Sequence, residues 1–451
     1  MAFSVHGQHV VVVGAARSGI AAAELLIDRG ARVTLSERRE RFPEADSLSE
    51  RGVSLELGGH RIDTFEKADL IVISPGVPPE QPAIDVARSR GVPVIAEIEL
   101  ASRWLKGRVI AITGTKGKST TTTLAGRILE QAGFDVTVGG NIGAPLSAQV
   151  ERSKPETLHV VETSSFQLEG IVDFRPWISV LLNVSPDHLD RHPDVGAYVA
   201  AKARIFENQQ ADDWAVVNAD DPIVLDLVTK ARARQRPFAR RTHLRYGTVI
   251  DSEWIANRHE SHTDRLVPLS AIHLLGPHLV YDVMAAVTVG AIAGASSDAM
   301  TAAVEAFRGL EHAMELVAEQ GDVRFVNDSK ATNVDAALHS IESFDAGLVP
   351  IIGGRFKGGD LGLLREPLKR RAKAVVAIGE AQARVRNAVA DVVPVHDAGS
   401  IDEAVRKAFE LARPSGVVLL APACSSFDMF RDYAERGQKF KEAVRRLVGS
   451  R

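Results

Sequence analysis

Short apolar segments alternate with amphipathic ones over the first hundred residues. Positions 20–27 carry apolar residues at helical spacing, and Gly30 ends that segment. Short apolar runs flank it and recur further on, at residues 9–13, 31–35, 70–74 and 92–95. Apolar strands separated by helices predict a parallel sheet that is covered on both faces.

The same alternation continues to the end of the chain. The next strands are predicted at residues 109–113, 159–163, 178–184, 214–218, 324–327, 348–352, 374–378 and 417–421. Helices are predicted at 119–131, 400–412 and 427–448. We therefore expect an α/β fold of three domains, over residues 1–96, 97–309 and 310–451. Six arginines within 231–245 predict a solvated loop or an edge face, rather than a phosphate-attracting patch.

Composition agrees with three ordinary globular domains. The chain has 451 residues, 45% of them hydrophobic and 25% charged, and a net charge of −4. This balance gives no reason to expect nucleic acid or an anionic membrane as a partner. Cys424 is the single cysteine, so an intramolecular disulfide is excluded. Without a secretory leader or a run of about 20 apolar residues, we expect a cytoplasmic location.

A glycine-rich turn between a predicted strand and a predicted helix is the strongest chemical signal. Its backbone N–H groups and the helix N-terminus suit phosphate oxygens. Lys118 would reach the terminal phosphates and Ser119 would hold Mg²⁺. The first glycine of the usual phosphate loop is replaced by Ile112. The residues of the turn are Gly114, Thr115, Lys116, Gly117, Lys118, Ser119 and Thr120.

Other polar residues follow the neighbouring strands of the middle domain. Glu162 ends a strand, His188 lies in a polar segment after the next one, and Lys202 follows on a predicted helix. Singly they are also explained as a surface acid, a structural histidine and a salt-bridge lysine. Together with the phosphate loop they indicate an Mg²⁺ shell.

Three polar turns follow strands of the last domain, at 327–333, 353–359 and 421–428. The carboxyl ends of parallel strands meet at one sheet edge, so these turns are predicted to converge on one site. Lys330 alone could be a solvated cation. For Cys424, packing is favoured over a nucleophilic role, because no paired base is evident.

Together with the segment 140–143, these motifs resemble the Mur ligases over essentially the whole chain. Residues 164–168, Ser-Ser-Phe-Gln-Leu, are typical of the member that adds D-glutamate. The resemblance implies Rossmann-like N- and C-terminal domains around a central P-loop ATPase-like domain. It also implies an ATP-dependent ligase that adds D-glutamate to UDP-N-acetylmuramoyl-L-alanine through an acyl phosphate, in peptidoglycan precursor synthesis. A monomer is expected, with Mg²⁺ and a carbamylated Lys202.

The resemblance also assigns roles to individual residues. The catalytic set is Lys118, Glu162, His188 and Lys202, and the metal ligands are Ser119, Glu162, His188 and Lys202. ATP would contact the phosphate loop together with Asp282 and Asp328. The UDP-substrate set is Gly14, Ser18, Gly19, Ser36, Arg38, Ser74, Gly76 and Asn141. The amino-acid set is Lys330, Thr332, Lys357, Ser426 and Tyr433.

Four positions depart from the family pattern and leave alternatives open. Glu37 puts the uracil contacts in doubt, and Leu279, Asp282 and Ala313 put the ATP contacts in doubt. One alternative is a nucleotide-binding protein without ligase activity. Another is a ligase that extends folate or a different muramoyl peptide. A third is a nicotinamide-dependent oxidoreductase, because Gly14-x-Ala16-x-x-Gly19 follows a strand and Glu37 stands near the position of a ribose-binding acid.

Overall fold

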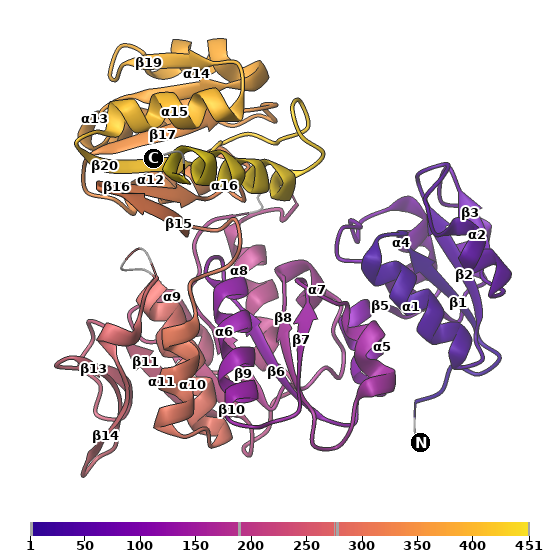
Figure 1. Cartoon of the computed structure of the whole chain (residues 1–451). Coiled ribbons are helices and arrows are strands. Elements are labelled where there is room, and N and C mark those ends of the chain that lie inside the picture. Colours follow the sequence, from indigo (N-terminus) through magenta and orange to yellow (C-terminus); the bar gives the residue numbers. More distant parts are fainter. Residues whose placement is uncertain (1–2, 188–190, 275, 277–278, 450–451) are drawn as a thin grey trace. The chain divides into compact units, whose positions relative to one another are not determined.

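The computed structural model describes residues 3–187, 191–274, 276 and 279–449. Three sheets succeed one another along the chain (Figure 1). By compactness the chain divides into two units. The first comprises residues 1–272 and 281–306 and holds the first two sheets; the second comprises 273–280 and 307–451 and holds the third.

The first sheet has five parallel strands in the order β3-β2-β1-β4-β5. Apolar residues alternate between its faces, so Val10 and Val12 pack with α1 while Val11 and Val13 pack with α3 and α4. The strands are β1 (His9–Val13), β2 (Arg32–Glu37), β3 (Ser54–Leu57), β4 (Leu70–Ile73) and β5 (Val94–Ala96). The helices are α1 (Arg17–Asp28), α2 (Ala45–Glu50), α3 (Ile62–Glu66) and α4 (Pro82–Ser89).

The second sheet has nine strands in the order β14-β13-β12-β11-β10-β9-β6-β8-β7. All neighbouring strands between β12 and the β7 edge of this sheet pair in parallel. At the other edge, β13 and β14 pair antiparallel. They are β6 (Arg108–Thr113), β7 (Val136–Gly140), β8 (Leu158–Glu162), β9 (Ile178–Leu181), β10 (Trp214–Asn218), β11 (Arg234–Ala239), β12 (Gly247–Asp251), β13 (Trp254–Arg258) and β14 (Thr263–Pro268). The helices are α5 (Glu97–Ser102), α6 (Lys118–Gln131), α7 (Ser165–Glu169), α8 (Val195–Ala203), α9 (Pro222–Val228), α10 (Leu279–Ala293) and α11 (Ser297–Ala306).

The third sheet has six strands in the order β15-β16-β20-β17-β18-β19, and only β15 runs antiparallel to its neighbour. Helices α12, α13 and α14 pack on one face, and α15 and α16 on the other. The strands are β15 (Glu315–Gln320), β16 (Asp322–Asn327), β17 (Leu348–Gly353), β18 (Val375–Ile378), β19 (Val395–Ala398) and β20 (Ser415–Leu420). The helices are α12 (Val334–Glu342), α13 (Arg365–Arg371), α14 (Gln382–Val389), α15 (Ile401–Ala412) and α16 (Tyr433–Gly449).

The three-layer α/β architecture predicted from the apolar pattern is confirmed, with one local correction. The arginine-rich segment 231–245 contains strand β11, which lies inside the second sheet between β10 and β12. Arg234 and Arg236 lie in this interior strand, whereas the other four arginines are exposed in the flanking loops, as predicted. Over the described part of the chain, no helix is both long and apolar enough to cross a membrane.

A buried carboxylate joins α5 to the segment 172–174. Glu99 in α5 is fully buried, and its Oε2 accepts hydrogen bonds from the backbone N–H groups of Val172, Asp173 and Phe174 at 2.8 to 3.0 Å. Its Oε1 accepts a hydrogen bond from Arg103 at 2.5 Å. Four charge-assisted or backbone bonds thus offset the cost of burying this charge.

Candidate active site

The phosphate loop lies at the carboxyl end of β6, between the ends of β8 and β9. The Asn183 side chain shapes it, because Oδ1 accepts hydrogen bonds from the N–H groups of Thr115 at 3.1 Å and Lys116 at 2.9 Å. Gly117 has a φ of 82°, which favours glycine, and it directly precedes α6. Ser119 and Thr120 follow in the first turn of that helix. The predicted strand–turn–helix context is therefore present.

Two lysines meet at this loop. Lys118 Nζ donates hydrogen bonds to the carbonyl oxygens of Gly114 at 3.0 Å and Thr115 at 2.9 Å. Lys202 Nζ, from α8, donates to the same Gly114 oxygen at 2.7 Å. Lys202 is 2% exposed, and burial, reinforced by repulsion from Lys118, lowers its pKa to about 7. A large fraction of this amine is therefore neutral near neutral pH.

Tyr198 is a site residue that the sequence reasoning missed. Its hydroxyl lies 3.0 Å from Thr115 Oγ1, and its ring lies under the Lys202 ammonium at 4.7 Å. Burial raises its pKa to about 12, so the phenol stays protonated. The available signal was its position four residues before Lys202, which puts both side chains on one face of α8.

Glu162 supplies an oxygen that suits a metal ion. It ends β8 and is 2% exposed; its Oε1 accepts a hydrogen bond from Asn141 Nδ2 at 2.8 Å, while Oε2 is buried and has no hydrogen-bond partner among the described residues. A buried carboxylate oxygen without a donor fits a hard cation such as Mg²⁺. The structure thus brings Asn141 to Glu162. His188, predicted as a further ligand, lies outside the described residues.

Asp282 lies directly against the phosphate loop. A Cβ added to Gly117 would overlap its carboxylate, so this pair requires glycine. Asp282 is fully enclosed, and burial raises its pKa to about 7 despite the opposing charge of Lys118. The structure therefore places this departure from the family pattern beside the loop that would hold phosphate.

The first turn of the N-terminal sheet is tightly built. Ser74 Oγ donates to the Gly14 carbonyl oxygen at 3.0 Å, and a Cβ on Gly19 would overlap that same oxygen. Ser18 lies beside Gly19 in the first turn of α1, and Gly76 lies two residues after Ser74. The structure thus gathers these five predicted residues around one turn.

Two further residues predicted to bind the UDP substrate differ in exposure. Ser36 is fully buried, and its hydroxyl donates to Glu56 at 2.9 Å and lies 2.8 Å from His60 Nδ1. Its side chain is therefore engaged inside the domain. Arg38 is exposed.

Glu37 is engaged within the N-terminal domain. Its carboxylate accepts hydrogen bonds from the N–H groups of Ala15 at 2.6 Å and Arg39 at 2.9 Å. Burial would raise its pKa, but the bonds from Arg39 and Ala15 outweigh burial and hold the pKa at about 2. The carboxylate therefore already has donors of its own, which weakens its role as a ribose-binding acid.

The three polar turns of the second unit converge as predicted, since they follow the adjacent strands β16, β20 and β17. Lys330 and Lys357 are exposed, Thr332 is half-buried, and Ser426 is 3% exposed. Tyr433 is 41% exposed at the start of α16. The Lys357 ammonium lies 5.3 Å from the centre of the Phe427 ring. This edge therefore offers two exposed cations and three hydroxyl groups, of which that of Ser426 is buried.

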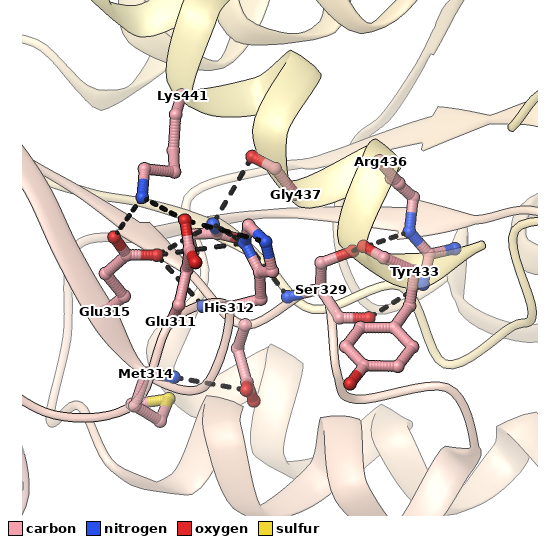
Figure 2. A network of polar contacts seen from close by, with 11 residues as sticks. Glu311, His312, Met314, Glu315, Ser329, Tyr433, Arg436, Gly437 and Lys441 are labelled. Carbon is pink, nitrogen blue, oxygen red and sulfur yellow. Dashed lines mark hydrogen bonds and ion pairs between the residues drawn. The ribbon is translucent and has the colours of Figure 1, made fainter. Parts of the chain in front are cut away.

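A polar network ties the first of these turns to α16 (Figure 2). His312 lies 2.9 Å from Asn327 Nδ2, and Lys441 from α16 bridges Glu311 at 2.9 Å and Glu315 at 2.6 Å. The Asp328 carboxylate accepts hydrogen bonds from Ser340 Oγ and from Met314 N–H. Burial raises the pKa of Asp328. This residue, predicted to contact ATP, is thus largely enclosed by its own unit.

Among the described residues, one group of side chains is close enough together to be compared with a metal site, at the β13–β14 hairpin. Asp264 Oδ2 lies 3.2 Å from His259 Nε2 and 3.6 Å from His262 Nε2. The two imidazole rings are stacked at 4.4 Å with only 9° between their planes. One ion cannot lie in both ring planes, so this arrangement is not a preformed metal site.

Three family models match the chain in order. They describe a Mur ligase MurD-like N-terminal domain over residues 8–96, a Mur ligase middle domain over 112–290, and a Mur ligase glutamate ligase domain over 312–424.

Curated relatives match nearly the whole chain. A UDP-N-acetylmuramoylalanine–D-glutamate ligase of Acidobacterium capsulatum is 47% identical, covering 97% of this chain and 96% of that protein. The ligase of the same name from Geotalea daltonii is 44% identical, covering 99% of both chains. Among solved structures, UDP-N-acetylmuramate-alanine ligase of Thermotoga maritima matches with a TM-score of 0.58 at 19% identity, over 98% of this chain and 100% of that one. That structural likeness shows a shared fold.

Proposed function

The chain belongs to the Mur ligase family and is an amide-bond-forming ligase of peptidoglycan precursor synthesis, and we propose how its residues divide the work of adding D-glutamate to UDP-N-acetylmuramoyl-L-alanine. The observation that carries the proposal is the meeting of Lys118, Lys202 and the glycine loop at the carboxyl end of β6. The Lys118 ammonium and a helix N-terminus there suit a triphosphate, and the Lys202 amine beside them is available for modification.

The first half-reaction activates an inert acid. The carboxylate of the UDP substrate attacks the terminal phosphorus of ATP, giving an acyl phosphate and ADP. Both reactants are anionic, so their approach requires positive charge. Lys118 leaves its two carbonyl partners to reach the terminal phosphates, and the loop N–H groups cradle them.

Mg²⁺ is the metal that this donor set fits. Ser119 and Glu162 would hold one ion, with Asn141 orienting Glu162 through its 2.8 Å hydrogen bond, and His188 and Lys202 would hold a second. Magnesium bound there would neutralise charge on the phosphates. We assign to Asn141 a second role, contact with the muramoyl substrate.

Lys202 serves as an oxygen ligand after modification. An ammonium cannot bind a cation, but a neutral lysine amine adds to CO₂ and loses a proton, giving an anionic carbamate. The lowered pKa of Lys202 supports this step, because the amine must be neutral to attack CO₂. The carbamate oxygens would then face the second metal position.

The second unit provides the amino-acid site. D-Glutamate carries two carboxylates, so its pocket needs cations and hydroxyl groups. Lys330 and Lys357 supply the charges, and Thr332, Ser426 and Tyr433 supply hydroxyl groups; all five come from loops at one sheet edge or from the adjoining start of α16. The amine attacks the acyl carbon, and the tetrahedral intermediate expels phosphate as the amide forms.

A coupled ADP-release assay tests this assignment. The purified chain is given Mg²⁺, ATP and UDP-N-acetylmuramoyl-L-alanine with D-glutamate, L-glutamate, L-alanine or meso-diaminopimelate. We expect turnover and a new amide product with D-glutamate alone. Product with another amino acid, or none with any, would contradict the assignment. The monomeric state stays a prediction for light scattering.

A further inference from the structure

Helix α16 carries a buried cation against the loops that hold the proposed amino-acid ligands. Arg436 is 1% exposed. Its Nε donates to Ser329 Oγ at 2.9 Å and its Nη2 to the Ser329 carbonyl oxygen at 2.8 Å (Figure 2). Its Nη1 donates to the Cys424 carbonyl oxygen at 3.0 Å. The planar guanidinium thus joins the turn after β16 to the turn after β20.

The turn after β17 packs on the same side chain. A Cβ added to Gly354 would lie 3.3 Å from Arg436 Nη1. Arg355 and Ser425 exchange two backbone hydrogen bonds, at 2.9 and 3.0 Å, which fasten this turn to the turn after β20. All three loops that carry proposed glutamate ligands therefore meet around one guanidinium.

The acceptors of this cation are neutral. Among the described residues, no carboxylate lies within the 4.0 Å of an ion pair with Arg436. Burial lowers its pKa to about 10, against weaker opposing effects from Cys424 and Asp428. A buried charge held only by carbonyl and hydroxyl oxygens is costly, and it leaves a positive potential that an anionic ligand would satisfy.

We propose that Arg436 is a positioning residue of the amino-acid site: it fixes the 328–332 and 421–426 loops in register and biases the pocket toward a dicarboxylate. Arg436 donates two of its hydrogen bonds to Ser329. The Ser329 hydroxyl in turn donates to the Tyr433 carbonyl oxygen at 2.7 Å, which links the loop to the start of α16. The inference rests on the proposed role of these loops in binding D-glutamate.

Steady-state kinetics of two variants tests the positioning role of Arg436. Arg436→Lys keeps the positive charge but loses the planar guanidinium with its several N–H donors. Arg436→Met loses both the charge and the donors. We expect the KM for D-glutamate to rise about tenfold or more in the first and further in the second, because two or more charge-assisted bonds are lost. The KM for UDP-N-acetylmuramoyl-L-alanine should change less than about twofold, since that substrate is assigned to the other unit.

Controls separate this role from simple loss of folding. Arg446→Met removes an exposed arginine of the same helix and should behave as the unmodified chain. Ser329→Ala deletes one acceptor of Arg436 and is measured alongside, so the test stands if Arg436→Met does not fold; a smaller rise in the same KM is expected.

The outcomes distinguish the two proposals. If the unmodified chain makes no amide product with D-glutamate, the proposed function is contradicted. If the unmodified chain turns over while Arg436→Lys and Ser329→Ala keep its KM for D-glutamate, the role of Arg436 is overturned. Equal losses toward all three substrates would also overturn it, because they would indicate a general structural role.

Discussion

Lys118 and Lys202 donate hydrogen bonds to one and the same oxygen, the carbonyl of Gly114. One lysine starts α6 and the other lies near the end of α8, so two separate segments deliver positive charge to a single peptide group. Their mutual repulsion adds to burial in lowering the pKa of Lys202. The neutral Lys202 amine that results is free for modification, and Lys118 remains the cation of the loop.

Removing the Lys118 ammonium should abolish most turnover. In Lys118→Ala we expect kcat to fall by about 100-fold or more, because the charge that builds up on the transferred phosphoryl group loses its main cation. ADP release measures the effect, and Lys439→Ala, at a half-exposed surface lysine, serves as the control. Near-normal kcat in Lys118→Ala would refute the role.

Lys202 should require CO₂. The amine is increasingly protonated below about pH 7, so activity in CO₂-depleted buffer should fall most steeply on the acid side of that value and recover with added bicarbonate. Lys202→Ala should be inactive and partly rescued by short carboxylic acids, which mimic a carbamate. A carbamate signal by NMR with ¹³C-labelled CO₂ checks the modification directly. If both the signal and the rescue are absent, the carbamate on Lys202 is excluded.

Asp282 should make stability depend on pH. Its folded pKa of about 7 lies above the ordinary 3.8, so the folded chain keeps a proton that the unfolded chain loses between those values. The free energy of unfolding therefore falls as the pH rises from about 3.8 to about 7, and it falls no further through this group above pH 7. At about 1.4 kcal/mol per pKa unit, Asp282→Asn should be more stable by a few kcal/mol at pH 8 and by little at pH 4.

The same substitution should affect ATP. At pH 8 the ionised carboxylate lies against the phosphate loop and opposes a triphosphate, so Asp282→Asn should lower the KM for ATP there and much less at pH 6. Thermal unfolding and ATP-dependent kinetics at both pH values measure the two effects. A stability difference independent of pH would show that Asp282 is ionised throughout.

Gly19 should be intolerant of a side chain. An alanine there would overlap the Gly14 carbonyl oxygen, which is backbone and cannot turn aside. We expect a loss of stability of about 1–3 kcal/mol from the forced shift and a KM for the UDP substrate raised about tenfold or more. Gly399→Ala, whose Cβ would make only an ordinary contact, is the control. Unchanged kinetics in Gly19→Ala would remove this turn from the substrate site.

The sequence predicted the strands whose apolar runs are continuous, such as β6 and β17, but not the parallel strands β7, β12 and β19. It missed β3, whose polar residues Ser54 and Glu56 alternate with leucines at a sheet edge, and β15 at another edge. It also missed β11, because arginines and Pro237 mask the strand pattern. Edge and polar strands are specified by their neighbours more than by their own residues.

In the candidate site, too, features encoded by local sequence were predicted, and features that depend on tertiary packing were missed. Local spacing was sufficient to locate the phosphate loop and to predict Glu162 at a strand end, but it did not predict the hydrogen bond from Asn141 to Glu162. The enclosure of Ser36 and the contact of Asp282 with Gly117 depend on tertiary packing, which no local pattern encodes. Arg436 was invisible for that reason: an arginine on a charged, amphipathic helix is ordinarily solvated.

The three N–H groups capped by Glu99 have a practical consequence for dissecting the protein. A middle-domain fragment that starts at residue 97 retains the carboxylate that orders 172–174, whereas one that starts at residue 103 leaves those amide hydrogens without an acceptor. Trimming between these two points should therefore turn a protease-resistant fragment into a readily digested one, even though every nucleotide-binding residue is retained.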